Sequence, residues 1–202
     1  IFNSRFTSYF LTKSKTIFMS IKNRLITMNF FQFFVWGAWL ITIANFWFGT
    51  KSWDGTQFGL VFSTMGIASL FMPTLTGILA DRWVNAEKLY GILHILYALV
   101  LFYLPQITTP DNFIYVMLLA MCCYMPTIAL SNSISYNALK LNNCDVVKDF
   151  PPIRVFGTIG FIVAMWITNL SGNKASAYQF YIAGVAAIGL GLYAFSLPKC
   201  KP

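Results

Sequence analysis

Acidic residues, histidine and cysteine are all scarce in this chain of 202 residues. It has six Asp and Glu, one His and four Cys. The carboxylates all lie in short polar segments or at the ends of apolar runs; they are Asp54, Asp81, Glu87, Asp111, Asp145 and Asp149. Hydrolases, redox carriers and metal enzymes need paired acids, histidine clusters or sets of Cys and His ligands. The composition therefore excludes most enzymes, and we expect no catalytic residue, no metal and no cofactor.

The cysteines do not have the spacing of a disulfide framework. Cys122 and Cys123 are adjacent, so on a helix their side chains point about 100° apart. Cys144 and Cys200 each stand alone in the sequence. We expect all four to be free thiols.

Long apolar runs make up most of the chain. The chain is 57% hydrophobic and 18% aromatic, and only 10% of its residues are charged. Six runs stand out, at residues 25–48, 58–80, 89–107, 113–130, 153–170 and 178–197. A hydrocarbon core about 30 Å thick needs roughly 20 apolar residues of helix, and a helix satisfies its own backbone hydrogen bonds there. The sequence therefore predicts an all-α, polytopic membrane protein with six transmembrane helices.

Positive charge is concentrated on one side of these runs. Of the fourteen Lys and Arg, only Lys51 and Lys174 follow the first and fifth runs; the others lie in the N-terminal arm, the alternate loops and the C-terminal tail. The positive-inside rule then places both termini in the cytoplasm, which agrees with six crossings. The net charge of +8 lies along this rim, where anionic lipid headgroups are the natural partner, so we expect no nucleic acid to bind.

The two ends of the chain differ from the apolar middle. Residues 1–18 have no apolar core of a signal peptide, and we expect them to be upstream read-through or a disordered arm, with Met19 as the start. Residues 19–198 are predicted to form one six-helix transmembrane bundle. Residues 199–202 are predicted to begin a cytoplasmic linker that leads to a second half.

The fifth run contains the strongest candidates for recognition of a solute. Arg154, Thr158 and Phe161 are spaced i, i+4 and i+7, so they share one face of the predicted helix. An arginine inside a membrane segment costs about 2.5 to 3.5 kcal/mol on insertion scales, which favours a polar cavity if it lies deep. An equally good interpretation is a rim charge that reaches the headgroups or pairs with Asp149. The residues alone do not decide between the two.

The first and fourth runs supply candidate cavity-lining residues. Gln32, Trp36 and Trp39 share a face of the first predicted helix, a combination that suits a flat polar solute, although packing between helices or against lipid is slightly favoured by the residues alone. Tyr136 lies in the polar run 131–137, which we expect either to line an aqueous vestibule or to be buried between helices.

A known superfamily is matched at the end of the second run. Gly77-Ile78-Leu79-Ala80-Asp81-Arg82 resembles the first half of the signature that the major facilitator superfamily carries between its second and third helices. The resemblance stops after Arg82, because residues 83–88 replace the usual glycine and basic cluster.

Longer motifs resemble one family within this superfamily, the bacterial nucleoside:proton symporters. They occur in the same order and spacing as in that family, from Met19 to about Pro198: Gln32-Phe33, Trp36-Gly37, Trp39-Leu40, Phe71-Met72-Pro73, Tyr124-Met125-Pro126-Thr127, Ile134-Ser135-Tyr136, Asp149-Phe150-Pro151-Pro152-Ile153-Arg154 and Gly157-Thr158-Ile159-Gly160-Phe161. The resemblance implies a twelve-helix transporter of the bacterial inner membrane, built from two six-helix bundles, of which this chain is the N-terminal one.

The resemblance also implies roles for particular residues. Arg154, Thr158 and Phe161 are expected to contact a nucleoside, and Asp81 with Arg82 to act in gating between the bundles. The acids that couple transport to a proton are expected in the C-terminal six-helix half, because none of the six runs contains one. A purely structural role at a helix end is the alternative for Asp81.

Two other functions stay open at this stage. One is a major facilitator transporter for another polar solute, such as a sugar. The other is a six-helix membrane scaffold that transports nothing.

Overall fold

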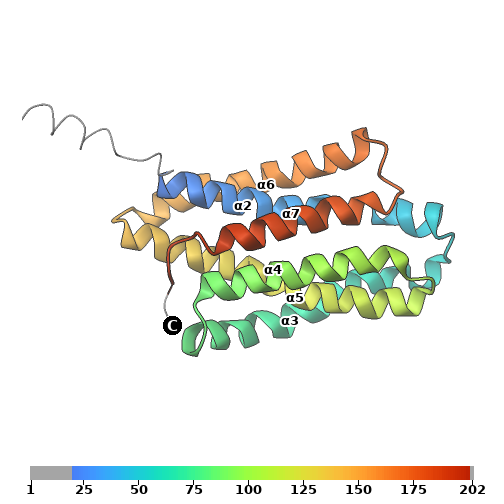
Figure 1. The fold of residues 1–202 in the computed structure, drawn as a ribbon, viewed down its shortest axis with the longest axis horizontal. Coiled ribbons are helices and arrows are strands. Elements are labelled where there is room, and N and C mark those ends of the chain that lie inside the picture. The colour runs from blue at the N-terminus through green and yellow to red at the C-terminus, as the bar shows by residue number, and fades with distance from the viewer. Residues whose placement is uncertain (1–19, 201–202) are drawn as a thin grey trace, which may run out of the picture.

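The computed structural model describes residues 20–200, and within that range it consists of helices and connecting turns without a strand. The six main helices (Figure 1) are α2 (Ile21–Gly37), α3 (Phe58–Arg82), α4 (Ala86–Tyr103), α5 (Pro110–Leu141), α6 (Val146–Leu170) and α7 (Tyr178–Ala194). Three short helical turns complete the list, η1 (Asn45–Thr50), η2 (Gly55–Gln57) and η3 (Leu104–Gln106). The expected N-terminal arm, residues 1–18, lies outside the described residues.

Within residues 20–200, four helical segments are long and apolar enough to cross a membrane: Gly55–Arg82, Ala86–Gln106, Pro110–Leu141 and Val146–Leu170. Helix α7 is apolar but has only 17 residues, and α2 also has 17 residues. The predicted all-α, polytopic fold is confirmed. The count of six crossings is approximate, because the first and the last helix are short.

The first predicted span is not one continuous helix. Helix α2 ends at Gly37, turns follow, and a π-helical segment begins at Asn45. A hydroxyl group from another helix reaches a backbone carbonyl at this break: Thr168 of α6 donates to the Ala38 carbonyl at 2.9 Å. Side chains that enter the backbone ladder in this way bend or interrupt helices.

Helix α5 is longer than the predicted fourth span, because it continues to Leu141 and includes the polar run 131–137. Ser131 and Ser135 are 1% and 0% exposed. Their hydroxyls donate to the carbonyls of Ile128 and Ser131, one turn earlier in the helix. These serines are therefore buried between helices with their hydrogen bonds satisfied, whereas Tyr136 is exposed.

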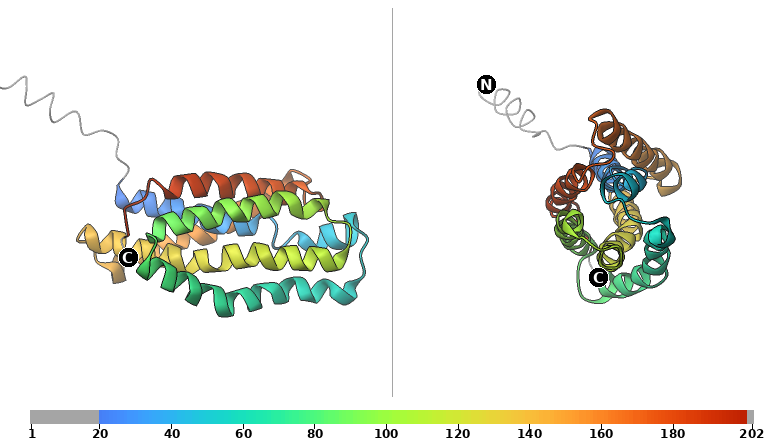
Figure 2. Two further views of the ribbon diagram at one scale, coloured as in Figure 1. Left: turned by 60° about the horizontal axis from the view of Figure 1, so that its bottom comes forward. Right: turned by 90° about the vertical axis from the view of Figure 1, so that its right-hand side faces the viewer.

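The helices pack in two layers. Helices α3, α5, α2 and α6 contact one another in that order, and α4 and α7 pack together behind them, against α5 and α2. The view along the bundle in Figure 2 shows α2 and α5 between α3 and α6. Helices α2 and α6 meet backbone to backbone, because a Cβ added at Gly160 would overlap the Phe30 carbonyl and one at Gly37 would overlap the backbone of Phe161. This contact sets the position of the α6 side chains against α2.

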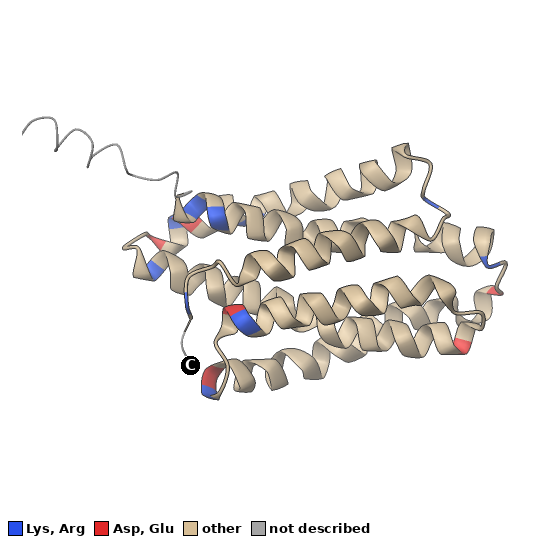
Figure 3. Cartoon of the chain, viewed as in Figure 1, with Lys and Arg blue, Asp and Glu red and all other residues tan. Residues whose placement is uncertain are grey.

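Charged residues lie at the ends of the bundle (Figure 3). Most of the Lys and Arg that the structure describes gather at one end, where both ends of the described chain also lie. The turns that carry Lys51 and Lys174 lie at the opposite end. The chain therefore crosses the bundle an even number of times.

Candidate functional site

Arg154 of α6 lies on an aromatic ring rather than beside a carboxylate. Its guanidinium carbon is 3.9 Å from the centre of the Phe33 ring of α2. Asp149, the alternative partner, instead forms an ion pair with Lys22, with 2.6 Å between Nζ and Oδ1. The rim-charge interpretation that pairs Arg154 with Asp149 is thus not the arrangement in this structure.

Gly157 provides the space for this stacking. A Cβ at this position would lie 2.6 Å from a Phe33 ring carbon and 2.8 Å from the Arg154 Nη1 nitrogen. A cation over an aromatic face gains about 0.5 to 1 kcal/mol at exposed sites and more when desolvated. The stacked guanidinium is half-buried, and among the described residues it has no ion-pair partner. Its N–H groups therefore remain available to acceptors on a solute.

Trp36 of α2 forms the centre of an aromatic wall next to Arg154. Its ring lies 6.1 Å from that of Phe161, nearly perpendicular to it, and 5.8 Å from that of Tyr124 on α5. The Phe33 ring, on which Arg154 stacks, is 6.5 Å from Trp36. The indole Nε1 of Trp36 is buried and has no hydrogen-bond partner within the described part of the chain. A buried polar group without a partner costs about 1 to 3 kcal/mol, so this N–H is an unsatisfied donor within the aromatic wall.

Gln32 is completely buried and holds three helices together rather than lining an open cavity. Its Nε2 donates to the Thr127 hydroxyl at 2.8 Å, and its Oε1 accepts from the Tyr90 hydroxyl at 2.7 Å. Its backbone carbonyl accepts from the Tyr124 hydroxyl, also at 2.7 Å. Because these partners come from α4 and α5, Gln32 fixes the position of the aromatic wall and presents no surface to a solute.

Trp39 is also buried, at 1% exposure, which agrees with the packing between helices that the residues alone slightly favoured over cavity lining. Its indole N–H donates to the Tyr97 hydroxyl at 2.8 Å, and its ring stacks on Phe180 of α7 at 6.3 Å. Trp39 therefore contributes to packing on the side of α7.

The other predicted site residues lie nearer the surface. Thr158 is exposed on α6, and Phe161 is half-buried one turn further on. Tyr136 is 41% exposed and packs edge to face on Phe150 of α6, with 4.6 Å between ring centres. Since Arg154 and Phe161 are half-buried and Thr158 is exposed, these residues form an open face of the bundle rather than an enclosed pocket.

Asp81 and Arg82 lie apart from this face, at the end of α3. Both are exposed, and neither takes part in an ion pair within residues 20–200. The structure does not bring them together with Arg154.

Sequence reasoning did not identify Phe33 and Tyr124 as parts of the site. Both belong to the motifs that resemble the symporter family, but neither has a charge or a spacing that marks it as a partner of Arg154. Their contribution depends on how α2, α5 and α6 pack.

These features together define a class of protein. The apolar helices form one bundle of a multi-pass membrane protein, and within the described residues its Arg154 guanidinium lies on an aromatic wall without a carboxylate partner.

Comparison with known proteins identifies the family. A sequence model described as nucleoside H+ symporter matches residues 19–202. The chain belongs to the nucleoside H+ symporter family, and the resemblance found in its motifs is confirmed.

Individual relatives agree with this assignment. Xanthosine permease of Escherichia coli is 48% identical over 181 residues, which cover 90% of this chain and 43% of that protein. Nucleoside permease NupG of Escherichia coli is 45% identical over 180 residues, 89% of this chain and 43% of the relative. The crystal structure of the nucleoside transporter NupG superposes with a TM-score of 0.86 and 45% identity, covering 89% of this chain and 44% of that one. The chain thus spans less than half the length of these relatives.

Proposed function

We propose that this chain is the N-terminal bundle of a proton-coupled nucleoside transporter of the bacterial inner membrane, and that it has no enzymatic activity. The observation that carries the proposal is the Arg154 guanidinium, stacked on Phe33 and free of carboxylates within the described chain. The family membership and the relatives named as permeases support the same substrate class.

The chemistry of the open face suits a nucleoside. Stacking of a base on an aromatic side chain is worth about 1 to 3 kcal/mol, and Phe161 with Trp36 supplies the rings. The guanidinium of Arg154 donates charge-assisted hydrogen bonds to carbonyl oxygens of the base. The Thr158 hydroxyl serves as donor and acceptor for a base or ribose group. A few such contacts give weak, reversible binding, as transport requires.

The open face needs a second bundle to close over it. Transporters of this type bind the solute near the membrane midplane between two bundles, which move against each other in alternating access. We place the C-terminal six-helix half opposite α3, α5, α2 and α6. The exposed Asp81 and Arg82 at the end of α3 are the proposed gating contacts with that half.

Proton coupling is assigned to the second bundle as well. A neutral nucleoside gains nothing from the membrane potential, whereas one proton supplies about 2.3 kcal/mol per 100 mV. The carboxylates of the described chain lie at the ends of the bundle (Figure 3), and none of them forms an ion pair with Arg154. Most of the described Lys and Arg lie at the end of the bundle where the described chain begins and ends (Figure 3). By the positive-inside rule, this distribution supports a cytoplasmic location for both ends of this chain.

The test is nucleoside uptake by the complete transporter, in which this chain is joined to its C-terminal bundle and reconstituted in proteoliposomes. An inward proton gradient should drive uridine uptake, and Arg154→Ala and Thr158→Val should reduce it by about tenfold or more, the loss of one charge-assisted or buried hydrogen bond. Lys148→Ala, on an exposed side chain of the same helix, is the matched control. Uptake that is unchanged in both site variants, or that is driven for a sugar and not for uridine, would contradict the proposal.

A further inference from the structure

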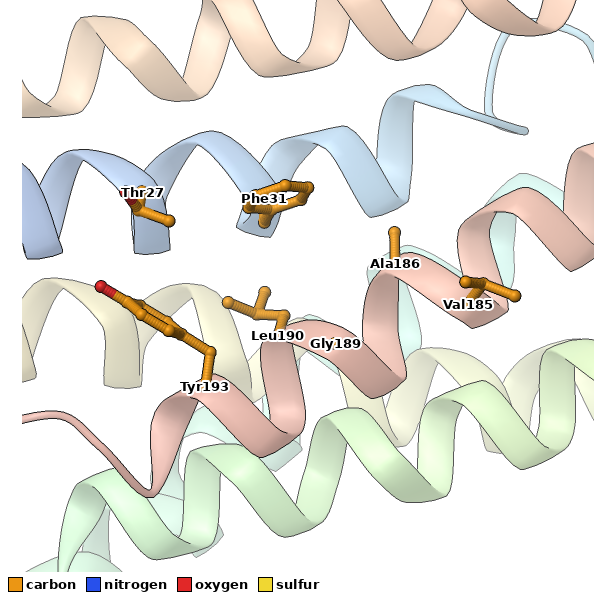
Figure 4. A pocket seen from close by; sticks show the side chains of 7 residues that line it. All are labelled: Thr27, Phe31, Val185, Ala186, Gly189, Leu190 and Tyr193. Atoms are coloured by element: carbon orange, nitrogen blue, oxygen red, sulfur yellow. The ribbon is translucent and has the colours of Figure 1, made fainter.

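A long apolar groove runs between α2 and α7, on the side of α2 away from the proposed nucleoside face. Figure 4 shows its first stretch, about 340 Å³, which is lined by Thr27, Phe31, Val185, Ala186, Gly189, Leu190 and Tyr193. A second stretch of about 490 Å³ shares Phe31, Val185 and Ala186 and continues to Tyr181. Phe31 and Trp36 are five residues apart, so they point roughly 140° apart around the helix. The groove is therefore separate from the site of Arg154.

The length of the groove matches one leaflet of a membrane. From Tyr193 to Tyr181 the groove follows twelve residues of α7, which corresponds to roughly 18 Å along a helix. Half of a hydrocarbon core is about 15 Å thick. A single extended acyl chain that starts at the rim therefore fits along the groove.

The middle of the groove is apolar, and hydroxyl-bearing residues lie at its two ends. Thr27 of α2 and Tyr193 of α7 lie at the end nearest the basic rim, and Tyr181 lies at the other end. The Tyr193 hydroxyl donates to the backbone carbonyl of Arg24 at 3.2 Å. This bond holds the first turn of α2 over the mouth of the groove.

Arg24 supplies a cation at this mouth. Its guanidinium donates to the Ser196 carbonyl just after α7. Within residues 20–200 no carboxylate lies within ion-pair distance of it, whereas the neighbouring Lys22 is neutralised by Asp149. A cation at the membrane rim attracts anionic headgroups, at about 1 kcal/mol per basic residue.

We propose that this groove binds one anionic phospholipid, with an acyl chain along α2 and α7 and the headgroup phosphate at Arg24. The apolar length selects a lipid tail, and the unneutralised guanidinium at its rim end selects an anionic headgroup over a zwitterionic one. The site is independent of nucleoside recognition.

The test is the amount of lipid that stays bound to the purified complete transporter, in which this chain is joined to its C-terminal bundle, measured by native mass spectrometry. The transporter is incubated with equal amounts of phosphatidylglycerol and phosphatidylethanolamine of the same chain length. We expect one retained lipid per chain and a preference for phosphatidylglycerol of about fivefold, the effect of one basic residue at a membrane surface.

Two variants with matched controls separate the tail from the headgroup. Gly189→Leu fills the groove without a clash, because a Cβ at Gly189 has no atom within 4 Å, and it should remove most of the retained lipid. Gly66→Leu on α3 is its control, since that glycine is equally open. Arg24→Gln should keep lipid binding but abolish the preference for phosphatidylglycerol, and Lys148→Gln should leave the preference unchanged.

Three outcomes would overturn the proposal. The first is equal retention of the two lipids by the unaltered protein, and the second is equal retention by Gly189→Leu and Gly66→Leu. The third is a dimer that Gly189→Leu dissociates while lipid retention is unchanged, because a second copy would then occupy the groove. Circular dichroism shows whether Gly189→Leu keeps the helical fold of the unaltered protein. If it does not, Arg24→Gln still tests the headgroup assignment, which is refuted if this variant keeps the preference for phosphatidylglycerol.

Discussion

Replacing Gln32 with Leu should loosen the contact between α2, α4 and α5, because this buried amide has side-chain hydrogen bonds to two other helices. The change removes the 2.8 Å bond to Thr127 and the 2.7 Å bond from Tyr90. It retains the bond from Tyr124, which goes to the Gln32 backbone. The volume of the side chain changes little, so lost hydrogen bonding is the main effect.

The magnitude follows from the number of bonds lost. Hydrogen bonds between transmembrane helices average about 0.6 kcal/mol and reach about 1.7 kcal/mol. Two lost bonds therefore predict a decrease in the free energy of unfolding of roughly 1 to 3 kcal/mol. Leaving the Tyr90 hydroxyl buried without a partner places the result toward the upper end of this range.

The assay is equilibrium unfolding of the chain in detergent, followed by circular dichroism. Gln106→Leu is the matched control, because Gln106 is exposed and its amide donates within its own helical segment, to the Phe102 carbonyl at 3.1 Å. If Gln32→Leu and Gln106→Leu unfold at the same denaturant concentration, the buried amide network does not hold these helices together and the reasoning is refuted.

Three further predictions use other parts of the structure. Gly160→Val should lower the free energy of unfolding by about 2 kcal/mol or more, because its Cβ would overlap the Phe30 carbonyl. Gly77→Val is the control and should leave the free energy of unfolding nearly unchanged, because a Cβ there meets no atom within 4 Å. Equal unfolding of the two variants would contradict the close α2–α6 contact. Asp149 raises the pKa of Lys22 above 10.5 through a hydrogen bond, so the stability from this pair should be complete below pH 10.5 and lost as the pH rises through the raised pKa. Thermal unfolding of the parent and Lys22→Gln should accordingly differ at pH 9 and converge at higher alkalinity, and a constant difference would exclude the pair as the cause. Cys144 is partly exposed between α5 and α6, and as the single retained cysteine it should react with an impermeant maleimide in inverted vesicles but not in intact spheroplasts. Ser52→Cys in a background without other cysteines should show the reverse. Labelling of Cys144 in intact spheroplasts would contradict the proposed orientation.

The fold could be predicted from the sequence because apolar length and charge distribution are local properties. The break after α2 could not, since it depends on Thr168, which reaches the Ala38 carbonyl from a position 130 residues further along the chain. The sequence also did not predict that α5 continues as a helix through its polar run. The Ser131 and Ser135 hydroxyls donate to backbone carbonyls one turn earlier, and these acceptors come into reach only when the helix forms.

The candidate site was predictable only in part. Helical spacing alone placed Arg154, Thr158 and Phe161 on one face. The same spacing grouped Trp39 with Gln32 and Trp36, and it could not separate them, because their roles are set by Tyr97, Thr127 and Phe161 on other helices. Likewise, two oppositely charged neighbours, Asp149 and Arg154, suggested an ion pair that Lys22 forms instead.

The most direct measurement is a structure of the complete transporter with a bound nucleoside. We predict that the base lies between the two bundles with a carbonyl oxygen within hydrogen-bond distance of the Arg154 guanidinium and its ring against Phe161 or Trp36. A nucleoside bound elsewhere, with Arg154 turned to the membrane edge and bound to a lipid phosphate, would contradict the assignment of this face as the substrate site.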